Sequence, residues 1–290
     1  MNRRRLLGAG LAALLGPAAA RAQMPAYTWD DGSVPFVVTP MEVVSRMLQL
    51  AEVGPGDTVI DLGSGDGRIV IEAAKRGARG LGLELDKSLV AAAAENARAA
   101  GVAGRARFEA MDLFAADFSA ATVVTIYLLP ELNAKLLPKL LALRPGTRIV
   151  SHDAGIGDWP FDERLELRVP DKPVGSGFSR VELWVVPARA AGSWRVELPE
   201  HGGRWTLGIA QRYQLLEVEV AATGGRDFVV PGVRLRGAQL SLVTNGIVGR
   251  RAWRNVFTGT VQGERITGEL RASDGNETRA YPWAAVRNSG

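Results

Sequence analysis

Between residues 39 and 190, the spacing of apolar positions switches repeatedly between the period of a strand and that of a helix. Short runs of aliphatic and β-branched residues alternate with segments whose apolar residues recur three and four positions apart. We predict strands at 58–62, 80–85, 105–110, 122–128 and 147–151, and helices at 39–50, 68–76, 88–100 and 131–143. Such alternation with short connections indicates an α/β fold, in which helices cover both faces of a parallel sheet. Two more runs, 163–169 and 178–186, predict an antiparallel end to that sheet.

After Pro187 the helical period disappears. Short alternating runs follow at 205–209, 215–220, 233–235, 238–243, 256–261 and 265–270. Turn signals separate them, among them Gly224-Gly225, Asn245-Gly246, Gly263 and Asp274-Gly275. This pattern predicts a small all-β domain of about six to eight strands, either a barrel or a sandwich. We therefore expect one domain over residues 23–190 and a second over 191–290, with the tryptophans of the second in its core.

The first 22 residues have the layout of a secretory signal peptide. Arg3, Arg4 and Arg5 precede an apolar run from Leu6 to Leu15, and Ala20-Arg21-Ala22 fits a cleavage site. The paired arginines permit a twin-arginine route, and the apolar run is short for a membrane span. We expect export to the periplasm, with an uncleaved N-terminal membrane anchor as the alternative.

Composition narrows the classes of partner and site. The chain has 35 Lys and Arg residues against 31 Asp and Glu, but four of the arginines lie in the first 22 residues. The remainder is balanced in charge, which gives no electrostatic reason to expect nucleic-acid binding. With no cysteine, and with His152 and His201 far apart, we expect no metal site.

A glycine-rich turn between the first strand and the next helix is the most informative segment. It reads Asp61-Leu62-Gly63-Ser64-Gly65-Asp66-Gly67-Arg68. The glycines allow a tight turn and close approach of a ligand to the backbone. The dinucleotide fingerprint requires a third Gly or Ala where Arg68 stands, and Asp61 would repel a pyrophosphate. The cationic methionine end of S-adenosylmethionine suits that acid better.

Acidic residues end three successive predicted strands. Asp61 ends the first, Glu84 the second, and Asp112 follows the third. A ligand of an open parallel sheet lies across the carboxyl ends of its strands. There, Glu84 can accept hydrogen bonds from ribose hydroxyls, and Asp112 can meet an adenine amino group. Acids are also common at helix caps, but their register with the glycine turn favours a cofactor site made of Asp61, Gly63, Ser64, Gly65, Asp66, Gly67, Glu84 and Asp112.

The stretch from Val34 to about Trp194 resembles a family of class I methyltransferases that includes bacterial relatives of the ATP synthase c-subunit lysine methyltransferases. Four segments carry the resemblance: Val34–Pro40, the Asp61–Arg68 turn, Ala121–Val124 with Tyr127-Leu128-Leu129-Pro130, and Pro145–His152. The resemblance implies a Rossmann-like methyltransferase sheet, S-adenosyl-L-methionine as cofactor and a lysine amine as the first substrate to consider. The mitochondrial members carry a membrane-anchoring segment where this chain has its export signal, so a membrane-associated substrate is one possibility.

The methyl acceptor would lie beside the end of the fourth strand. Tyr127, Asn133 and His152 are the candidate catalytic residues there, because they could orient an amine or accept its proton. Packing of Tyr127 and a hydrogen bond from His152 to a neighbouring loop are the structural alternatives. Three functions stay open: N-methylation of a protein or peptide amine, methylation of a small molecule, and an exported binding protein without catalysis. The oligomeric state is not predicted.

Overall fold

The computed structural model describes residues 36–175, 177–198, 205–222, 228–248 and 251–288. The proposed signal peptide, residues 1–22, lies outside the described residues, as does His201. Within the described part of the chain, no helix combines the length and apolar character needed to cross a bilayer.

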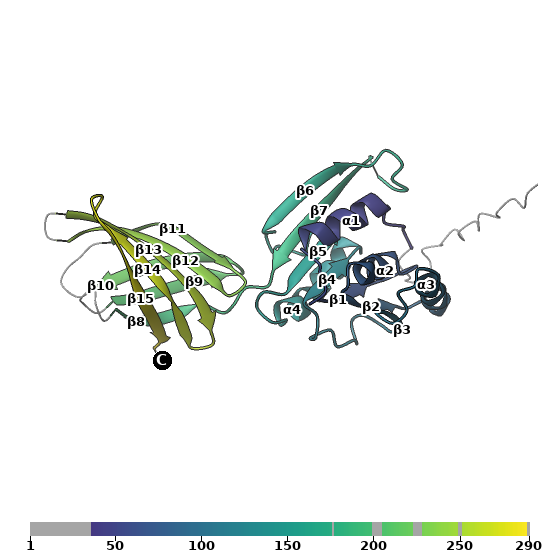
Figure 1. Cartoon of the computed structure of the whole chain (residues 1–290), viewed down its shortest axis with the longest axis horizontal. Coiled ribbons are helices and arrows are strands. Elements are labelled where there is room, and N and C mark those ends of the chain that lie inside the picture. The colour runs from purple at the N-terminus through teal and green to yellow at the C-terminus, as the bar shows by residue number, and fades with distance from the viewer. Residues whose placement is uncertain (1–35, 176, 199–204, 223–227, 249–250, 289–290) are drawn as a thin grey trace, which may run out of the picture. The chain divides into compact units, whose positions relative to one another are not determined.

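The first sheet has seven strands in the order β3-β2-β1-β4-β5-β7-β6 (Figure 1). Its strands are β1 (Thr58–Leu62), β2 (Arg79–Glu84), β3 (Ala106–Ala110), β4 (Val123–Ile126), β5 (Arg148–His152), β6 (Glu163–Arg168) and β7 (Phe178–Val185). Strands β1 to β5 pair in parallel, whereas β7 runs antiparallel to β5 and β6 antiparallel to β7. The predicted α/β sheet and its antiparallel end are therefore confirmed.

Helices cover the two faces of this sheet because successive strand residues point to opposite sides. The helices are α1 (Met41–Leu50), α2 (Arg68–Lys75), α3 (Lys87–Ala99) and α4 (Pro130–Leu141). On one face, Val59 packs in a cluster with side chains of α1 and α2. On the other, Ile60 packs in a cluster that contains Leu136 and Leu140 of α4. Residues adjacent in β1 thus belong to two separate cores.

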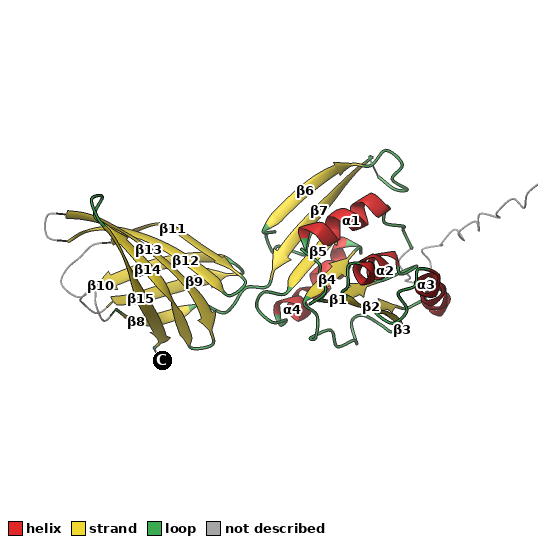
Figure 2. Ribbon diagram, in the orientation of Figure 1, coloured by secondary structure: helices red, strands yellow, loops and turns green. Residues whose placement is uncertain are grey.

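The second sheet has eight antiparallel strands in the order β10-β9-β8-β15-β14-β13-β12-β11 (Figure 2). They are β8 (Gly192–Glu197), β9 (Trp205–Arg212), β10 (Leu215–Ala222), β11 (Phe228–Arg236), β12 (Gln239–Val248), β13 (Arg251–Gln262), β14 (Arg265–Ser273) and β15 (Thr278–Arg287). Strands that follow one another in the chain are paired, except that β10 does not pair with β11. The first strand, β8, also pairs with the last, β15. The sheet curves into a nearly closed barrel, which decides between the two predicted architectures.

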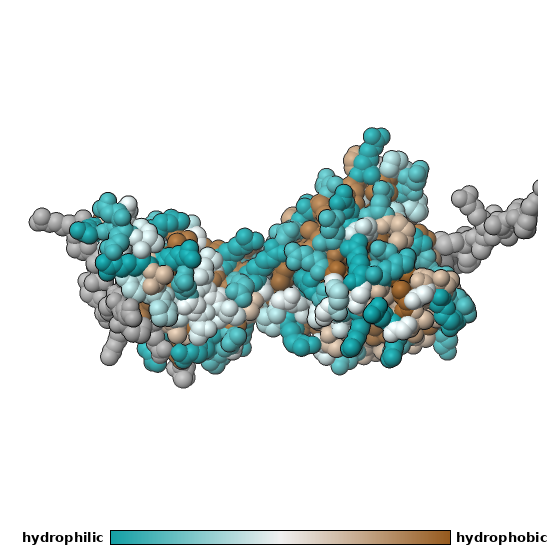
Figure 3. All heavy atoms as spheres, viewed as in Figure 1, coloured by the Kyte–Doolittle hydropathy of each residue, from teal (hydrophilic) through white to brown (hydrophobic). Residues whose placement is uncertain are grey.

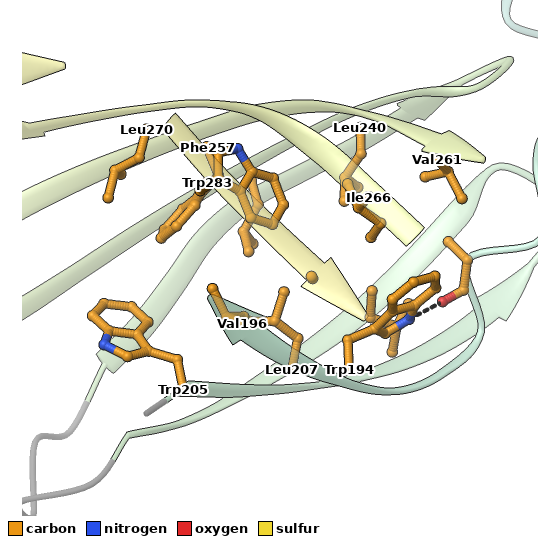
Figure 4. Packing of buried hydrophobic residues seen from close by; sticks show 14 of the residues in the cluster. Trp194, Val196, Trp205, Leu207, Leu240, Phe257, Val261, Ile266, Leu270 and Trp283 are labelled. Atoms are coloured by element: carbon orange, nitrogen blue, oxygen red, sulfur yellow. Dashed lines mark hydrogen bonds between the residues drawn. The ribbon is translucent and has the colours of Figure 1, made fainter. Parts of the chain in front are cut away.

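Aromatic side chains fill the interior of this sheet. Trp194, Trp205 and Trp283 are buried, as predicted, and the Phe257 ring packs edge-on against Trp283 at a centroid distance of 5.1 Å. Figure 4 shows these side chains pointing toward one another from strands on opposite sides of the interior. The indole N–H of Trp194 donates to the Ala190 carbonyl at 2.8 Å, so this buried donor is satisfied (Figure 4).

One turn prediction in this sheet is wrong. Asn245 and Gly246 lie inside β12, where they pair with Arg254 and Trp253 of β13. The backbone pairing with β13 continues through them to the end of β12, so cross-strand pairing outweighs the local turn preference of Asn-Gly. The turns predicted at Gly263 and Gly275 are confirmed, and both glycines have the positive φ angle that such turns require.

Candidate cofactor and methyl-acceptor site

The glycine turn that leads from β1 into α2 has a backbone that only glycine adopts easily. Gly63, Gly65 and Gly67 have φ angles of 80°, 52° and 79°. A Cβ atom at Gly67 would also lie 2.6 Å from the Phe108 ring and 2.8 Å from the Ala93 Cβ. The turn is therefore packed directly against β3 and α3, and its shape depends on the absence of a side chain at Gly67.

Asp61 is a buried carboxylate at the end of β1. It is 2% exposed, and the Thr125 hydroxyl donates to its Oδ1 at 2.6 Å. Burial raises the pKa of Asp61 to about 7; the Thr125 hydrogen bond opposes this shift, while Glu84 and Asp66 add to it. A cationic ligand placed beside Asp61 would relieve the cost of this buried negative charge.

Glu84 ends β2 and is tied to the glycine turn. One carboxylate oxygen accepts from the Gly65 amide at 2.9 Å, and the other accepts from the amides of Leu85 and Asp86 at 2.8 and 3.0 Å. These bonds fix its carboxylate at the carboxyl end of the strand, next to the end of β1. The structure therefore brings together two of the three predicted acids, Asp61 and Glu84, around one turn.

The other predicted cofactor residues have local roles as well. Asp112 follows β3, is exposed, and accepts from the Phe114 amide at 2.8 Å. Asp66 forms an ion pair with Arg68, which also donates to the Thr39 carbonyl at 2.8 Å. The Ser64 hydroxyl is buried and has no hydrogen-bond partner in the described residues.

Tyr127 and His152 meet at the ends of β4 and β5. Their ring centroids are 4.1 Å apart, and His152 is fully buried. His152 Nε2 lies 2.9 Å from the Ser179 hydroxyl and 3.3 Å from Asp153 Oδ2. Burial lowers the pKa of His152 to about 4; the Asp153 carboxylate opposes this shift and the Lys172 ammonium adds to it. His152 is therefore neutral at pH 7.

Asn133 lies in the second turn of α4, after the end of β4. It is fully buried, and its side-chain amide donates to the carbonyls of Gly155 at 3.1 Å and Ala154 at 3.4 Å. Its carbonyl oxygen has no partner in the described residues, and neither does Nδ1 of His152. The fold thus places one buried hydrogen-bond acceptor in α4, the helix after β4, and another at the last residue of β5.

Three further residues shape these sites and were not predicted. Thr125 holds Asp61, and Lys172 forms an ion pair with Asp153 although its side chain is only 6% exposed. The third is Asp153, which follows His152 directly in the chain with a positive φ of 61°. Its carboxylate accepts from the Arg180 amide of β7 at 2.9 Å. The sequence offered one signal for Thr125. Alternate residues of β4 share a face of the sheet, and Thr125 is a polar residue on the same face as the apolar Val123.

The comparisons with known proteins agree with this geometry. A family model described as the ANTKMT methyltransferase domain matches residues 61–163. A protein-lysine N-methyltransferase of Saccharolobus islandicus is 46% identical over 137 residues, which are 46% of this chain and 85% of the relative. The ATP synthase c-subunit lysine N-methyltransferase of Mus musculus is 33% identical over 195 residues, 64% of this chain and 74% of the relative. The chain belongs to the ANTKMT family of class I methyltransferases.

A solved structure adds a further likeness. The Salinibacter ruber protein described as an RNA methyltransferase in complex with S-adenosyl-L-homocysteine is 48% identical. It covers 57% of this chain and 97% of its own, with a TM-score of 0.49.

The methyltransferase uses S-adenosylmethionine as its cofactor, and the residues at the ends of β1 and β2 fit that molecule. The buried carboxylate of Asp61 suits the cationic methionine end, and the glycine turn leaves room for close backbone contact. Glu84, held at the end of β2, would accept hydrogen bonds from the ribose hydroxyls.

Proposed function

We propose that this methyltransferase N-methylates lysine side chains of a protein substrate. The relatives from Saccharolobus islandicus and Mus musculus, whose names give lysine as the methylated residue, support this proposal. The observation in this chain that carries it is that two buried acceptors have no partner among the described residues: Asn133 Oδ1 in α4 and His152 Nδ1 at the end of β5. Acceptors without a competing donor among the described residues are suited to the N–H groups of an amine.

The surroundings of His152 define which of its nitrogens can accept. Nε2 faces a carboxylate oxygen of Asp153, so a neutral ring places its hydrogen on Nε2. Nδ1 is then unprotonated and can accept from an amine N–H. Because its pKa is about 4, His152 orients the amine but does not keep a proton at pH 7, and the proton of the lysine ammonium passes to solvent.

The chemical step needs only binding, alignment and exclusion of water. Held by Asp61, Glu84 and the glycine turn, S-adenosylmethionine would supply a methyl group activated by the adjacent sulfonium. The neutral lysine nitrogen would take this methyl group as its bond to sulfur breaks, which would leave a methylated ammonium and a neutral thioether. Tyr127, whose pKa burial and then Asp153 raise to about 12, remains a neutral phenol and forms one wall beside His152.

The test uses the full chain, methyl-labelled S-adenosylmethionine and cell protein extracts in two states. One extract is untreated, and in the other all lysine amines are blocked by acetylation, which leaves amide nitrogens that cannot accept a methyl group. Label that enters the untreated extract, is lost on blocking, and appears as methyl-lysine after hydrolysis is the expected result. Label only in small metabolites would instead support methylation of a small molecule, and label in another amino acid would contradict the choice of lysine.

Variants separate binding from chemistry. Asn133→Leu should lower the methylation rate at least about tenfold, because a charge-assisted hydrogen bond to the reacting amine is lost, and should leave S-adenosylhomocysteine binding unchanged. If no extract is labelled although the cofactor binds, the chain functions as a binding protein on a methyltransferase fold and the proposal fails.

We also propose that the N-terminal segment exports the protein, with the periplasm as its destination. The basic start at Arg3–Arg5 and the apolar run from Leu6 to Leu15 support this. Sequencing the N-terminus of the protein isolated from its own cells tests it. A mature start at Gln23 is the expected result, whereas a retained N-terminus in a membrane fraction would favour an uncleaved anchor.

A further inference from the structure

A second concave site lies at the opposite edge of the seven-stranded sheet from the cofactor residues. It has a volume of about 810 Å³ and is lined by residues at the amino ends of β1 and β2 and along β3. Because β1, β2 and β3 run in parallel, their amino ends lie at the edge away from Asp61 and Glu84. The two sites are therefore separate.

Three arginines line this concavity: Arg79, Arg105 and Arg107. Strand register explains their proximity. Leu81 pairs with Arg107, so Arg79, two residues earlier in β2, lies on the same sheet face as Arg107 and across from Arg105. Backbone geometry puts neighbouring strands roughly 5 Å apart and alternate residues of one strand roughly 7 Å apart. Three positive side chains therefore share one small area of the sheet.

The guanidinium groups of these arginines have no partner within the described residues. None of the three donates a side-chain hydrogen bond or forms an ion pair there, although ion pairs engage Arg68, Arg76, Arg98, Arg148 and Arg164 of the same sheet and its helices. Glu109, the acid that also lines the site, pairs with none of them. Like charges on adjacent positions of a sheet are unfavourable unless something neutralises them.

The sheet face beneath these arginines is free of the helices that cover its neighbours. Gly80, Gly82 and Phe108 turn toward α2 and α3, whereas Arg79, Leu81 and Arg107 point the other way. The chain between β3 and β4, residues 111–122, forms turns and irregular structure, with no helix. Leu81 packs against the cluster that contains Ala116 and Phe118, whereas the three arginines stay exposed and open to a ligand. Hydrophilic residues cover much of the face of the described residues that is seen in Figure 3.

We propose that this concavity binds a small polyphosphate ligand, such as a nucleoside triphosphate. Guanidinium groups bind phosphate oxygens in a bidentate manner, and three of them match a chain of phosphates. The volume is within the usual range for small-molecule sites. Leu81 and Pro55 supply an apolar wall for a base, next to the Thr58 hydroxyl.

The test is a calorimetric titration of the full chain with sodium triphosphate and with ATP, each in the presence of saturating S-adenosylhomocysteine. Saturation keeps adenine out of the cofactor site, so any binding reports on the second site. Triphosphate and ATP binding that weakens as salt is raised is expected. Tighter binding of ATP than of triphosphate would identify the apolar wall as a base site, and equal binding would assign recognition to the phosphates alone.

The matched variants are the double substitution Arg105→Gln/Arg107→Gln and the control Arg144→Gln, an exposed arginine outside the concavity. The double variant should bind triphosphate at least about tenfold more weakly, because charge-assisted hydrogen bonds are lost, and its melting temperature without ligand should not fall. The control should bind as the unmodified protein does. S-adenosylhomocysteine affinity should be the same in all three, so failure here is distinguishable from failure of the proposed methylation.

Three results would overturn the proposal. These are no binding of either probe, equal binding by the double variant, and binding of a single-stranded RNA or of anionic phospholipid vesicles without binding of triphosphate. The last would assign the arginines to a macromolecular or membrane surface.

Discussion

Replacing Asp61 with Asn should stabilise the protein in the absence of cofactor while abolishing cofactor binding. In the folded protein, burial raises the pKa of Asp61 from 3.8 to about 7. Between pH 3.8 and about pH 7, Asp61 is therefore mostly protonated in the folded state and mostly ionised in the unfolded state. Stability is lost as pH rises through this window and is lowest above pH 7, where the buried carboxylate is charged.

The size of the effect follows from the shift. Each pKa unit corresponds to 1.36 kcal/mol, so a change of about three units is worth about 4 kcal/mol at full ionisation. Between pH 5 and pH 8, linkage predicts a loss of roughly 2–3 kcal/mol in the unmodified protein that Asp61→Asn does not show. The difference in unfolding free energy between variant and unmodified protein should grow by that amount over this pH range.

Urea denaturation of both proteins at pH 5 and pH 8, without cofactor, measures this difference. Thr125→Val is the matched control with the opposite sign. It removes the hydrogen bond that lowers the pKa of Asp61, so its deficit in stability should be larger at pH 8 than at pH 5. A stability difference between Asp61→Asn and the unmodified protein that is the same at both pH values would refute the reasoning. So would unimpaired binding of S-adenosylmethionine by the variant.

Three further predictions concern other parts of the molecule. Gly67→Ala should lower the unfolding free energy by about 1–3 kcal/mol, measured by urea denaturation, because its Cβ would meet the Phe108 ring in a backbone of positive φ. Trp283→Ala should lower the unfolding free energy of the eight-stranded sheet by about 3–5 kcal/mol, and its melting temperature should fall. The folded variant should keep its affinity for S-adenosylhomocysteine. The pH profile of kcat should show no inflection near pH 6.5, and His152→Gln should lower kcat, because neutral His152 acts as an acceptor only.

The order of strands and helices in the methyltransferase sheet could be predicted because local periodicity encodes it. Buried strands such as β4 are short runs of β-branched residues, and α1 and α2 have apolar residues at helical spacing. The prediction from local sequence was wrong at Asn245-Gly246, because pairing with β13 decides the conformation there. The division of the chain near residue 190 stays a prediction.

The cofactor residues were predictable for a related reason. Asp61 and Glu84 lie at fixed places relative to one turn, so strand register alone brings them together. The surroundings of His152 were not predictable in the same way. Asp153 follows His152 directly in the chain, but Lys172 and Ser179 come close only because β7 returns antiparallel beside β5, and no local spacing specifies which residues that return will align.

The pairing of β8 with β15 has a consequence for synthesis of the protein. Every strand of the methyltransferase sheet precedes residue 186, so that sheet is complete before β8 leaves the ribosome. The second sheet is different, because its first strand waits for its last, and Ala284 to Arg287 are the residues that pair with Glu197 to Trp194. Until they emerge, β8 and β14 each present an unpaired edge. A premature stop before residue 278 would therefore leave the finished methyltransferase sheet followed by two separate smaller sheets, β10-β9-β8 and β14-β13-β12-β11, with new unpaired edges at β8 and β14 that could pair with other chains.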